Sequence, residues 1–310
     1  MTIVCTVLAT LPLLLEGPPL LSFAAGAASE PTGPFLATSL GPPPSGADAG
    51  AKPPGEPASG ESKSAAEDGE LSLDDLLAKL EHADRDIRDY HANLVYETFD
   101  ALLDTSERQF GRLVFEMDPS AGRRLAFVFD QYVDGAGRTE RDEHRYVFSG
   151  SWMCDVDVQR KQFIKRQVVP PDQRFDPLKV GEGPFPLPIG QAAEDVRARF
   201  VAAFAPAPTA KLLASLDPNT LHGLRLVPKP GTEAARDFAQ IDLYYDRATF
   251  MPVAVDATGI EGNRKIVRLS KAVANAGLAA DDVALLSIEP PDPGQWTIDI
   301  RAWKSEPATP

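Results

Sequence analysis

Between residues 110 and 169 the chain contains a series of short segments in which aromatic or aliphatic residues alternate with charged ones. The alternation runs through FGRLVFE, RLAFVFD, HRYVFSGSW and RKQFIKRQVV, and the turn dipeptides Asp134-Gly135 and Ser149-Gly150 lie between segments. A period of two predicts β-strands, and tight turns between them predict antiparallel hairpins. Each such strand has an apolar face that a helix or a ligand must cover.

A helix is predicted before these strands. Ser72 and Asp75 have the spacing of a capping box. From residue 73 the apolar positions recur at helical spacing, which predicts a helix of about eighteen residues over 73–90. The period then changes to two, and residues 91–102 are predicted to form the first strand.

The second half follows a proline-dense stretch over residues 168–190, which is predicted to be a long loop because proline lacks the amide donor of a central strand. Residues 191–204 are predicted to form a short helix. Strands are expected at LHGLRLVPK, DFAQIDLYYD, FMPVAVDAT and NRKIVRLS, with 285–289 and WTIDIRAW as further edges.

This order of elements predicts a mainly β fold with some helix, in the α+β class. Ten or eleven consecutive antiparallel strands exceed what a flat open sheet usually carries. We therefore expect a strongly curled antiparallel sheet that forms an incomplete β-barrel, with helices as a lid.

The N-terminal residues predict export. Residues 4–15 are apolar but too short to cross a bilayer, and small residues follow up to Ala27, so we interpret 1–27 as a signal peptide. The absence of Lys or Arg near the start leaves open an apolar leader upstream of a later start codon. Residues 28–69 are rich in Pro, Gly and Ala and predict a disordered tether, and 70–310 are predicted to form a single domain.

Composition excludes several partners. The formal net charge is −14, and both nucleic acids and anionic bilayers require a basic surface. The two cysteines are Cys5 and Cys154, so the predicted mature chain has no internal disulfide. We expect a soluble monomer in the periplasm.

Residues that carry chemistry are sparse. The four histidines have no metal-ligand spacing, and no nucleophile or nucleotide-binding motif occurs. Asp155 and Asp157 are interpreted as a solvated strand edge and Cys154 as a buried, inert thiol. The sequence predicts no enzyme, no cofactor and no metal.

From residue 73 to 303 the order of these motifs resembles the periplasmic lipoprotein carriers of the LolA type. The resemblance rests on HANLVYE, on QFGRLVFEMDPSAGRRLAFVFD, on YVFSGSWMCDVDVQRKQFIKR and on FAQIDLYYDRATFMPVAVDA. It implies an incomplete barrel closed by helices, with an apolar interior for acyl chains. Arg123 or Arg124 would inherit the arginine that holds the lid closed, since both stand where the family has Arg-Pro.

A carrier in water must provide a deep apolar slot, because each exposed methylene costs ~0.8 kcal/mol. The candidate lining residues are aromatic or aliphatic, and for each of them ordinary core packing is the alternative. A mobile flap over the mouth or a rigid surface loop is predicted at Phe185, Leu187 and Ile189. The predicted lining residues are Tyr96, Phe99, Phe115, Phe127, Phe129, Tyr146, Phe148, Trp152, Phe163 and Ile164.

The sequence thus favours a non-enzymatic envelope carrier that binds lipid acyl chains or lipoproteins for transfer to the outer membrane. Its partners would be an acylated lipoprotein or lipid and a membrane receptor. The alternative is a periplasmic lipid or lipoprotein sensor domain that regulates a membrane-anchored partner. A hydrolase of unusual type is a third hypothesis.

Overall fold

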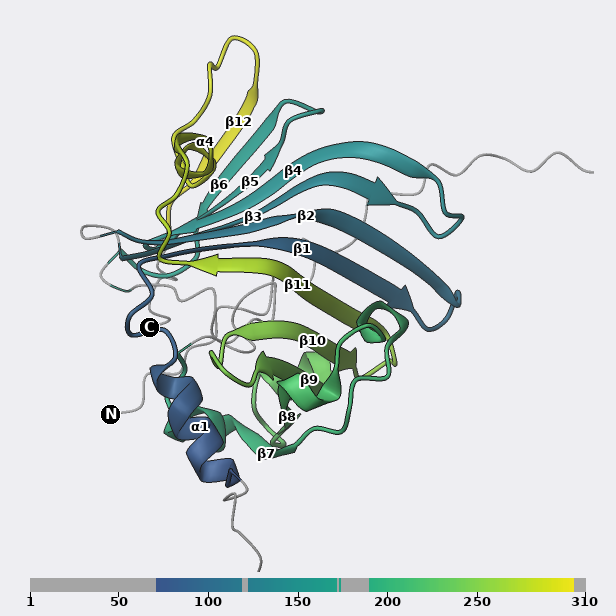
Figure 1. Cartoon of the computed structure of the whole chain (residues 1–310). Coiled ribbons are helices and arrows are strands. Elements are labelled where there is room, and N and C mark those ends of the chain that lie inside the picture. Colours follow the sequence, from purple (N-terminus) through teal and green to yellow (C-terminus); the bar gives the residue numbers. More distant parts are fainter. Residues whose placement is uncertain (1–70, 119–121, 172, 174–189, 304–310) are drawn as a thin grey trace, which may run out of the picture. The chain divides into compact units, whose positions relative to one another are not determined.

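The computed structural model describes residues 71–118, 122–171, 173 and 190–303, all within the compact unit that begins at Leu71. Most of them lie in β-strands (Figure 1). The elements of the first half are α1 (Leu73–His82), β1 (Asp89–Asp100), β2 (Thr105–Asp118), β3 (Gly122–Val133), β4 (Thr139–Ser149), β5 (Trp152–Asp157) and β6 (Gln162–Gln167).

The second half returns to the first strand. It comprises α2 (Ala193–Arg199), β7 (Phe200–Phe204), β8 (Leu221–Pro228), α3 (Ala234–Asp237), β9 (Phe238–Asp246), β10 (Pro252–Gly259), β11 (Arg264–Ala274), α4 (Ala280–Leu285) and β12 (Thr297–Arg301), with short 3-10 turns at Lys211–Leu213 and Pro218–Thr220. Strand β11 pairs antiparallel with β1, so the two meanders join at their first and last strands.

The described strands form one sheet of twelve, in the order β12-β6-β5-β4-β3-β2-β1-β11-β10-β9-β8-β7. All neighbours are antiparallel except β12, which runs parallel to β6. Strands β12 and β7 are the two ends of this order, and they do not pair with each other. The mainly β, α-containing fold class and the large antiparallel sheet are confirmed.

Two predicted helices are shorter than their apolar spacing indicates. Helix α1 ends at His82, and the chain turns through hydrogen bonds from Arg85 N to His82 O and from Ile87 N to Asp84 O. Tyr90 continues the helical spacing but lies in β1, opposite Phe115. The prediction over 73–90 was wrong at its C-terminal end because pairing with β2 outweighs local periodicity.

Residues 191–204, predicted as one helix, contain a helix followed by a strand. Helix α2 ends at Arg199, and residues 200–204 become β7 because they pair with β8. The predicted edge strand at 285–289 was wrong, since α4 ends at Leu285 and the next residues are irregular. The other predicted edge, WTIDIRAW, is confirmed as β12.

Strand register assigns side chains to two faces of the sheet, because directly paired residues project to the same side. One face, here called the helix face, contains the row Leu224, Leu243, Val255, Val267 and Tyr96 across β8, β9, β10, β11 and β1. It continues over β2 to β4, where Leu113, Phe127 and Tyr146 are in register. Helix α1 packs against this face.

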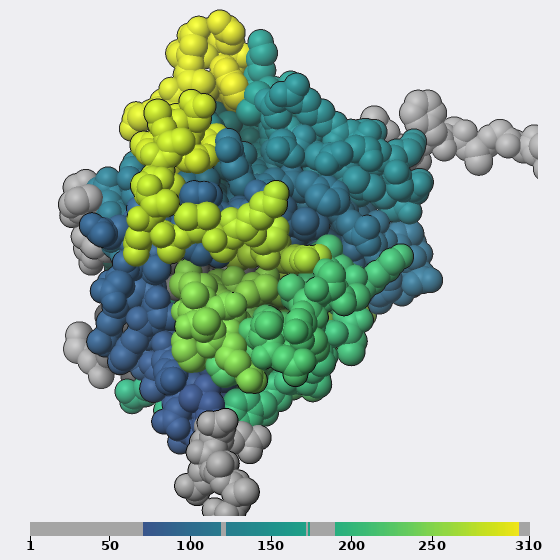
Figure 2. Space-filling model, in the orientation of Figure 1, coloured from purple at the N-terminus to yellow at the C-terminus, as the bar shows by residue number. Residues whose placement is uncertain are grey.

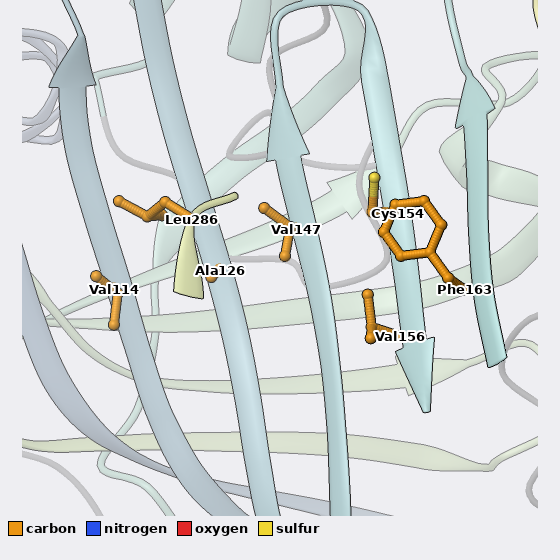
Figure 3. Packing of buried hydrophobic residues seen from close by; sticks show 7 residues of the cluster. All are labelled: Val114, Ala126, Val147, Cys154, Val156, Phe163 and Leu286. Atoms are coloured by element: carbon orange, nitrogen blue, oxygen red, sulfur yellow. The ribbon is translucent and has the colours of Figure 1, made fainter. Parts of the chain in front are cut away.

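The opposite face is also apolar. One cluster contains Val114, Ala126, Val147, Cys154 and Phe163 from β2 to β6, and Leu286 from the residues after α4 packs against it (Figure 3). The space-filling view shows the yellow C-terminal segment against the teal strands (Figure 2). A second cluster joins Tyr244, Ala254 and Ile266 to Leu213 and its neighbours. The sheet therefore has a core on each side.

Candidate functional site

Helix α1 begins as its sequence predicts. The hydroxyl of Ser72 accepts a hydrogen bond from the Asp75 amide at 3.1 Å, which satisfies one of the free donors of the first turn. Leu76, Leu77 and Leu80 form the buried side of the helix. Their burial against the helix face stabilises the contact by roughly 5–9 kcal/mol in total.

The contact between α1 and the sheet contains a small cavity of about 20 Å³. This is room for about one water molecule, whereas sites for small organic ligands are about 300–1,000 Å³. The helix face is therefore closed at this point by α1 and α2. The lining residues are Leu77, Leu80, Gly190, Gln191, Val196, Leu224, Leu226, Leu243 and Tyr245.

Arg123 connects the sheet to the segment that follows α1. It lies opposite Met117 in the β2–β3 hairpin, and its guanidinium forms an ion pair with the carboxylate of Asp84. Both side chains are mostly buried, with exposed fractions of 24% and 10%. A largely desolvated arginine–carboxylate pair holds its partners more firmly than a surface pair.

Gly190 lies directly against the carboxylate of Asp84. Its φ is +67°, and a Cβ at this position would lie 2.2 Å from the Asp84 carboxylate. Only glycine adopts this conformation and leaves this space without strain. The chain before α2 thus passes directly over the ion pair that follows α1.

Arg124, the neighbouring arginine, points elsewhere. It pairs with Glu116 and Asp118 of β2 on the opposite face of the sheet. Of the two candidates for the lid contact, Arg123 is therefore the one that reaches the region of α1.

The two helices are also tied to each other. Glu81 Oε2 accepts a hydrogen bond at 3.2 Å from the amide of Ala193, at the start of α2, and Asp74 forms an ion pair with Arg197. A negative side chain at a helix N-terminus satisfies a free amide there. On the other flank of α1, the Lys79 ammonium lies 5.0 Å from the centre of the Phe250 ring.

An aromatic row runs along the helix face from β1 to β4. Tyr96, Phe129 and Tyr146 have successive ring centroids 6.4 and 6.5 Å apart. Phe127 and Phe148 form a neighbouring edge-on pair at 6.3 Å. These spacings are those of favourable aromatic contacts in a packed core.

The ten predicted lining residues do not share one surface. Register places seven on the helix face: Tyr96, Phe115, Phe127, Phe129, Tyr146, Phe148 and Ile164. Phe99, Trp152 and Phe163 lie on the opposite face, and Phe163 is fully buried in its first cluster. The predicted flap residues Phe185, Leu187 and Ile189 lie outside the described residues.

A partly buried histidine–aspartate pair was missed by the sequence analysis. His144 Nε2 lies 2.5 Å from Asp155 Oδ1 across β4 and β5, and its ring stacks on Tyr146 at 4.6 Å. Burial lowers the pKa of His144, but the hydrogen bond to Asp155 and the charges of Asp155, Asp142 and Asp157 raise it above 6.5 overall.

Asp155 and Asp157 share a face, as the sequence predicts, but they are not a solvated edge. Asp157 is 7% exposed, and Asp155 is covered by the His144 contact. The signal that could have revealed the pair is parity: a two-residue turn at 150–151 pairs Ser149 with Trp152, and this register sets His144 and Asp155 on the same face. The spacing alone does not reveal whether that face is buried.

Comparisons with known proteins give structural neighbours only. No protein-family model matches the sequence, and no curated protein matches it. A domain assigned to outer membrane lipoprotein sorting from Vibrio parahaemolyticus is similar over 68% of this chain and 97% of its own, at 14% identity and a TM-score of 0.34.

Two further solved structures are also similar to this chain at low sequence identity and low TM-score. The MucA/MucB complex of Pseudomonas aeruginosa matches 67% of this chain and 59% of that chain, at 15% identity and a TM-score of 0.37. A LolA superfamily protein from Nitrosomonas europaea matches 68% of this chain and 97% of its own, at 9% identity and a TM-score of 0.29. The predicted resemblance thus has its counterpart among solved structures, but a likeness this distant carries no argument about binding.

In the described part of the chain, no group of three or more His, Cys, Asp and Glu residues is arranged to hold a metal ion. None of the helices described is long and apolar enough to cross a membrane. Cys154 is free and buried, and burial raises the pKa of its thiol to about 12.

Proposed function

We propose that this protein is a non-enzymatic envelope carrier, exported to the periplasm, that binds the acyl chains of a lipid or lipoprotein on the helix face of its sheet. In this proposal the sheet curls into an incomplete barrel, α1 is the lid, and the Arg123–Asp84 ion pair is its latch. The observation that carries the proposal is an apolar helix over an apolar sheet face, joined at its rim by a few polar contacts.

The energies involved are compatible with opening. Moving α1 away would expose its three buried leucines at a cost of roughly 5–9 kcal/mol. A sixteen-carbon chain gains on the order of 10 kcal/mol when it leaves water for the same apolar surface. Cargo could therefore replace the helix on the sheet without a large net penalty, and an empty protein would stay closed.

Buried aromatic residues of the helix face extend the proposed site beyond the cavity under α1. Tyr96, Phe127 and Phe129 are at most 4% exposed. Tyr96 lies in β1, which pairs with β11, and the two phenylalanines lie in β3, which pairs with β2. In this proposal they form the wall along which the acyl chain lies once the lid has moved.

Native mass spectrometry of gently purified protein tests this function. We expect masses that exceed that of the polypeptide by a bound lipid or acylated peptide, and loss of the added mass on delipidation. An apolar dye should then bind the delipidated protein and be displaced by a fatty acid. A protein that is always empty and takes up no dye would contradict the proposal; if it instead bound a membrane-anchored partner, the sensor alternative would be favoured.

A further inference from the structure

Two hairpin turns lie side by side at one end of the sheet, far from α1 in the strand direction. Residues 101–104 connect β1 to β2, and residues 260–263 connect β10 to β11 (Figure 1). The amide of Ala101 donates a hydrogen bond to Asn263 Oδ1 at 2.9 Å, and a Cβ on Gly262 would be 3.4 Å from Ala101 Cβ. The two turns therefore form one tip.

This tip exposes three large aliphatic side chains. Leu102 is 91% exposed, Leu103 62% and Ile260 61%. Single exposed leucines are common on protein surfaces, but a group of three on adjacent turns marks a surface that meets an apolar environment. None of the three contributes to the core, so packing does not account for them.

Several backbone amides of the tip already have hydrogen-bond acceptors within the protein. The amides of Leu102 and Leu103 both donate to Asp100 Oδ1, at 2.8 and 2.9 Å, and the amide of Gly262 donates to Gly259 O at 3.1 Å. An amide that already has a partner within the protein can be transferred to an apolar medium at much lower cost than a free one.

The charges of the tip indicate which lipid headgroups it would meet favourably. Both turns lack Lys and Arg, and they carry the exposed carboxylates of Asp104 and Glu261. An anionic bilayer attracts basic segments and repels these groups. Headgroups that carry an ammonium, such as phosphatidylcholine and phosphatidylethanolamine, complement them.

A protein partner is less well matched to the tip. The residues that dominate protein–protein binding are mostly Trp, Tyr and Arg, whereas leucine is under-represented. The two turns contain none of the three favoured types.

We propose that Leu102, Leu103 and Ile260 insert reversibly into a lipid surface with zwitterionic headgroups and so dock the protein on a membrane. This inference goes beyond the proposed carrier function and rests on different residues. Three partly exposed aliphatic side chains bury less surface than one myristoyl chain, which by itself gives only reversible membrane binding. The docking would therefore be transient.

Vesicle flotation with protein purified after expression of the complete chain tests the docking. The wild type is expected to float with phosphatidylcholine–phosphatidylethanolamine vesicles, and added phosphatidylglycerol should weaken its binding. The double variant Leu102→Ser, Leu103→Ser should bind at least about tenfold more weakly, since both insertions are lost. Val201→Ser, at an apolar position 58% exposed on β7, is the matched control and should bind as the wild type does.

Several results would overturn the proposal. One is a wild type that does not bind the vesicles, which is the result expected if the tip docks on a protein instead. A second is binding that requires phosphatidylglycerol. A third is equal binding of the wild type and the double variant, which would also result if the N-terminal sequence, identical in all variants, were the part that binds. Native mass spectrometry of the double variant separates this test from that of the carrier function, because bound cargo should be unchanged.

Discussion

At the scale of single residues, the two adjacent arginines Arg123 and Arg124 have different partners. Arg123 pairs with Asp84 beyond α1, whereas Arg124 pairs with Glu116 on the neighbouring strand. They project to opposite faces because neighbouring residues in a strand alternate. The sequence could not choose between them, since the choice depends on which face the first helix covers.

This difference gives a matched pair of variants. In Arg123→Ala the buried carboxylate of Asp84 loses its cation, so stability should fall by about 1–3 kcal/mol and α1 should open more often. Hydrogen exchange of the amides of 76–82 should be several-fold faster, and dye uptake should rise. Arg124→Ala should leave exchange in α1 unchanged; equal effects of the two substitutions would exclude a latch role for Arg123.

A second residue-scale prediction concerns His144. Its folded-state pKa is raised by Asp155 against the effect of burial. A raised pKa means that the protonated form stabilises the fold; the contribution is fully present below about pH 6.5 and disappears as the pH rises through the folded-state pKa. The stability difference between the wild type and His144→Phe should therefore shrink with rising pH in denaturant titrations. A difference that grows with pH would contradict the assignment of the raised pKa.

At the scale of elements, alternation and turn residues predicted most of the sheet. The hairpin strands, the two turn dipeptides and the four later strands are all present. The errors occur where one stretch satisfies two periods, as at Tyr90, or where a helix runs directly into a strand, as at Phe200. Strand pairing decides such cases, and a local pattern contains no information on the partner strand.

Helix α1 is the element on which the proposed site depends. Leu77 is 3% exposed and borders the cavity, so Leu77→Ala should lower the free energy of unfolding by about 2–4 kcal/mol and enlarge the space under the helix. Uptake of an apolar dye should rise accordingly. Leu102→Ala, at a 91% exposed position, is the control and should change stability by less than about 0.5 kcal/mol. A Leu77 variant as stable as this control would show that α1 is not held by its apolar side.

At the scale of the whole described unit, the sheet has two separate cores. Leu77 belongs to the helix face, and Leu286, fully buried after α4, belongs to the opposite face. The C-terminal segment is held there by Lys165 Nζ, which donates to Ile288 O at 3.1 Å, and by β12, the edge strand that pairs with β6.

The two cores should contribute independently to stability. Leu286→Ala should cost about 2–5 kcal/mol, whereas Val283→Ala, 38% exposed one turn earlier, should cost far less. In a double variant of Leu77 and Leu286 the two effects should add within about 0.5 kcal/mol, because the sites share no partners. Chemical denaturation of the four proteins measures this, and strong non-additivity would indicate a single connected core.

The sequence by itself determined the strand-rich class, the antiparallel meanders and the start of α1, because periodicity, turn chemistry and capping are local properties. Only the tertiary structure decided which aromatic residues share a face, that Arg123 rather than Arg124 pairs with the segment after α1, and that His144 meets Asp155. It also brought the turns at 101–104 and 260–263 into one tip. The physical reason is that these contacts join residues distant in sequence, whose meeting depends on register and on the order of strands in the sheet.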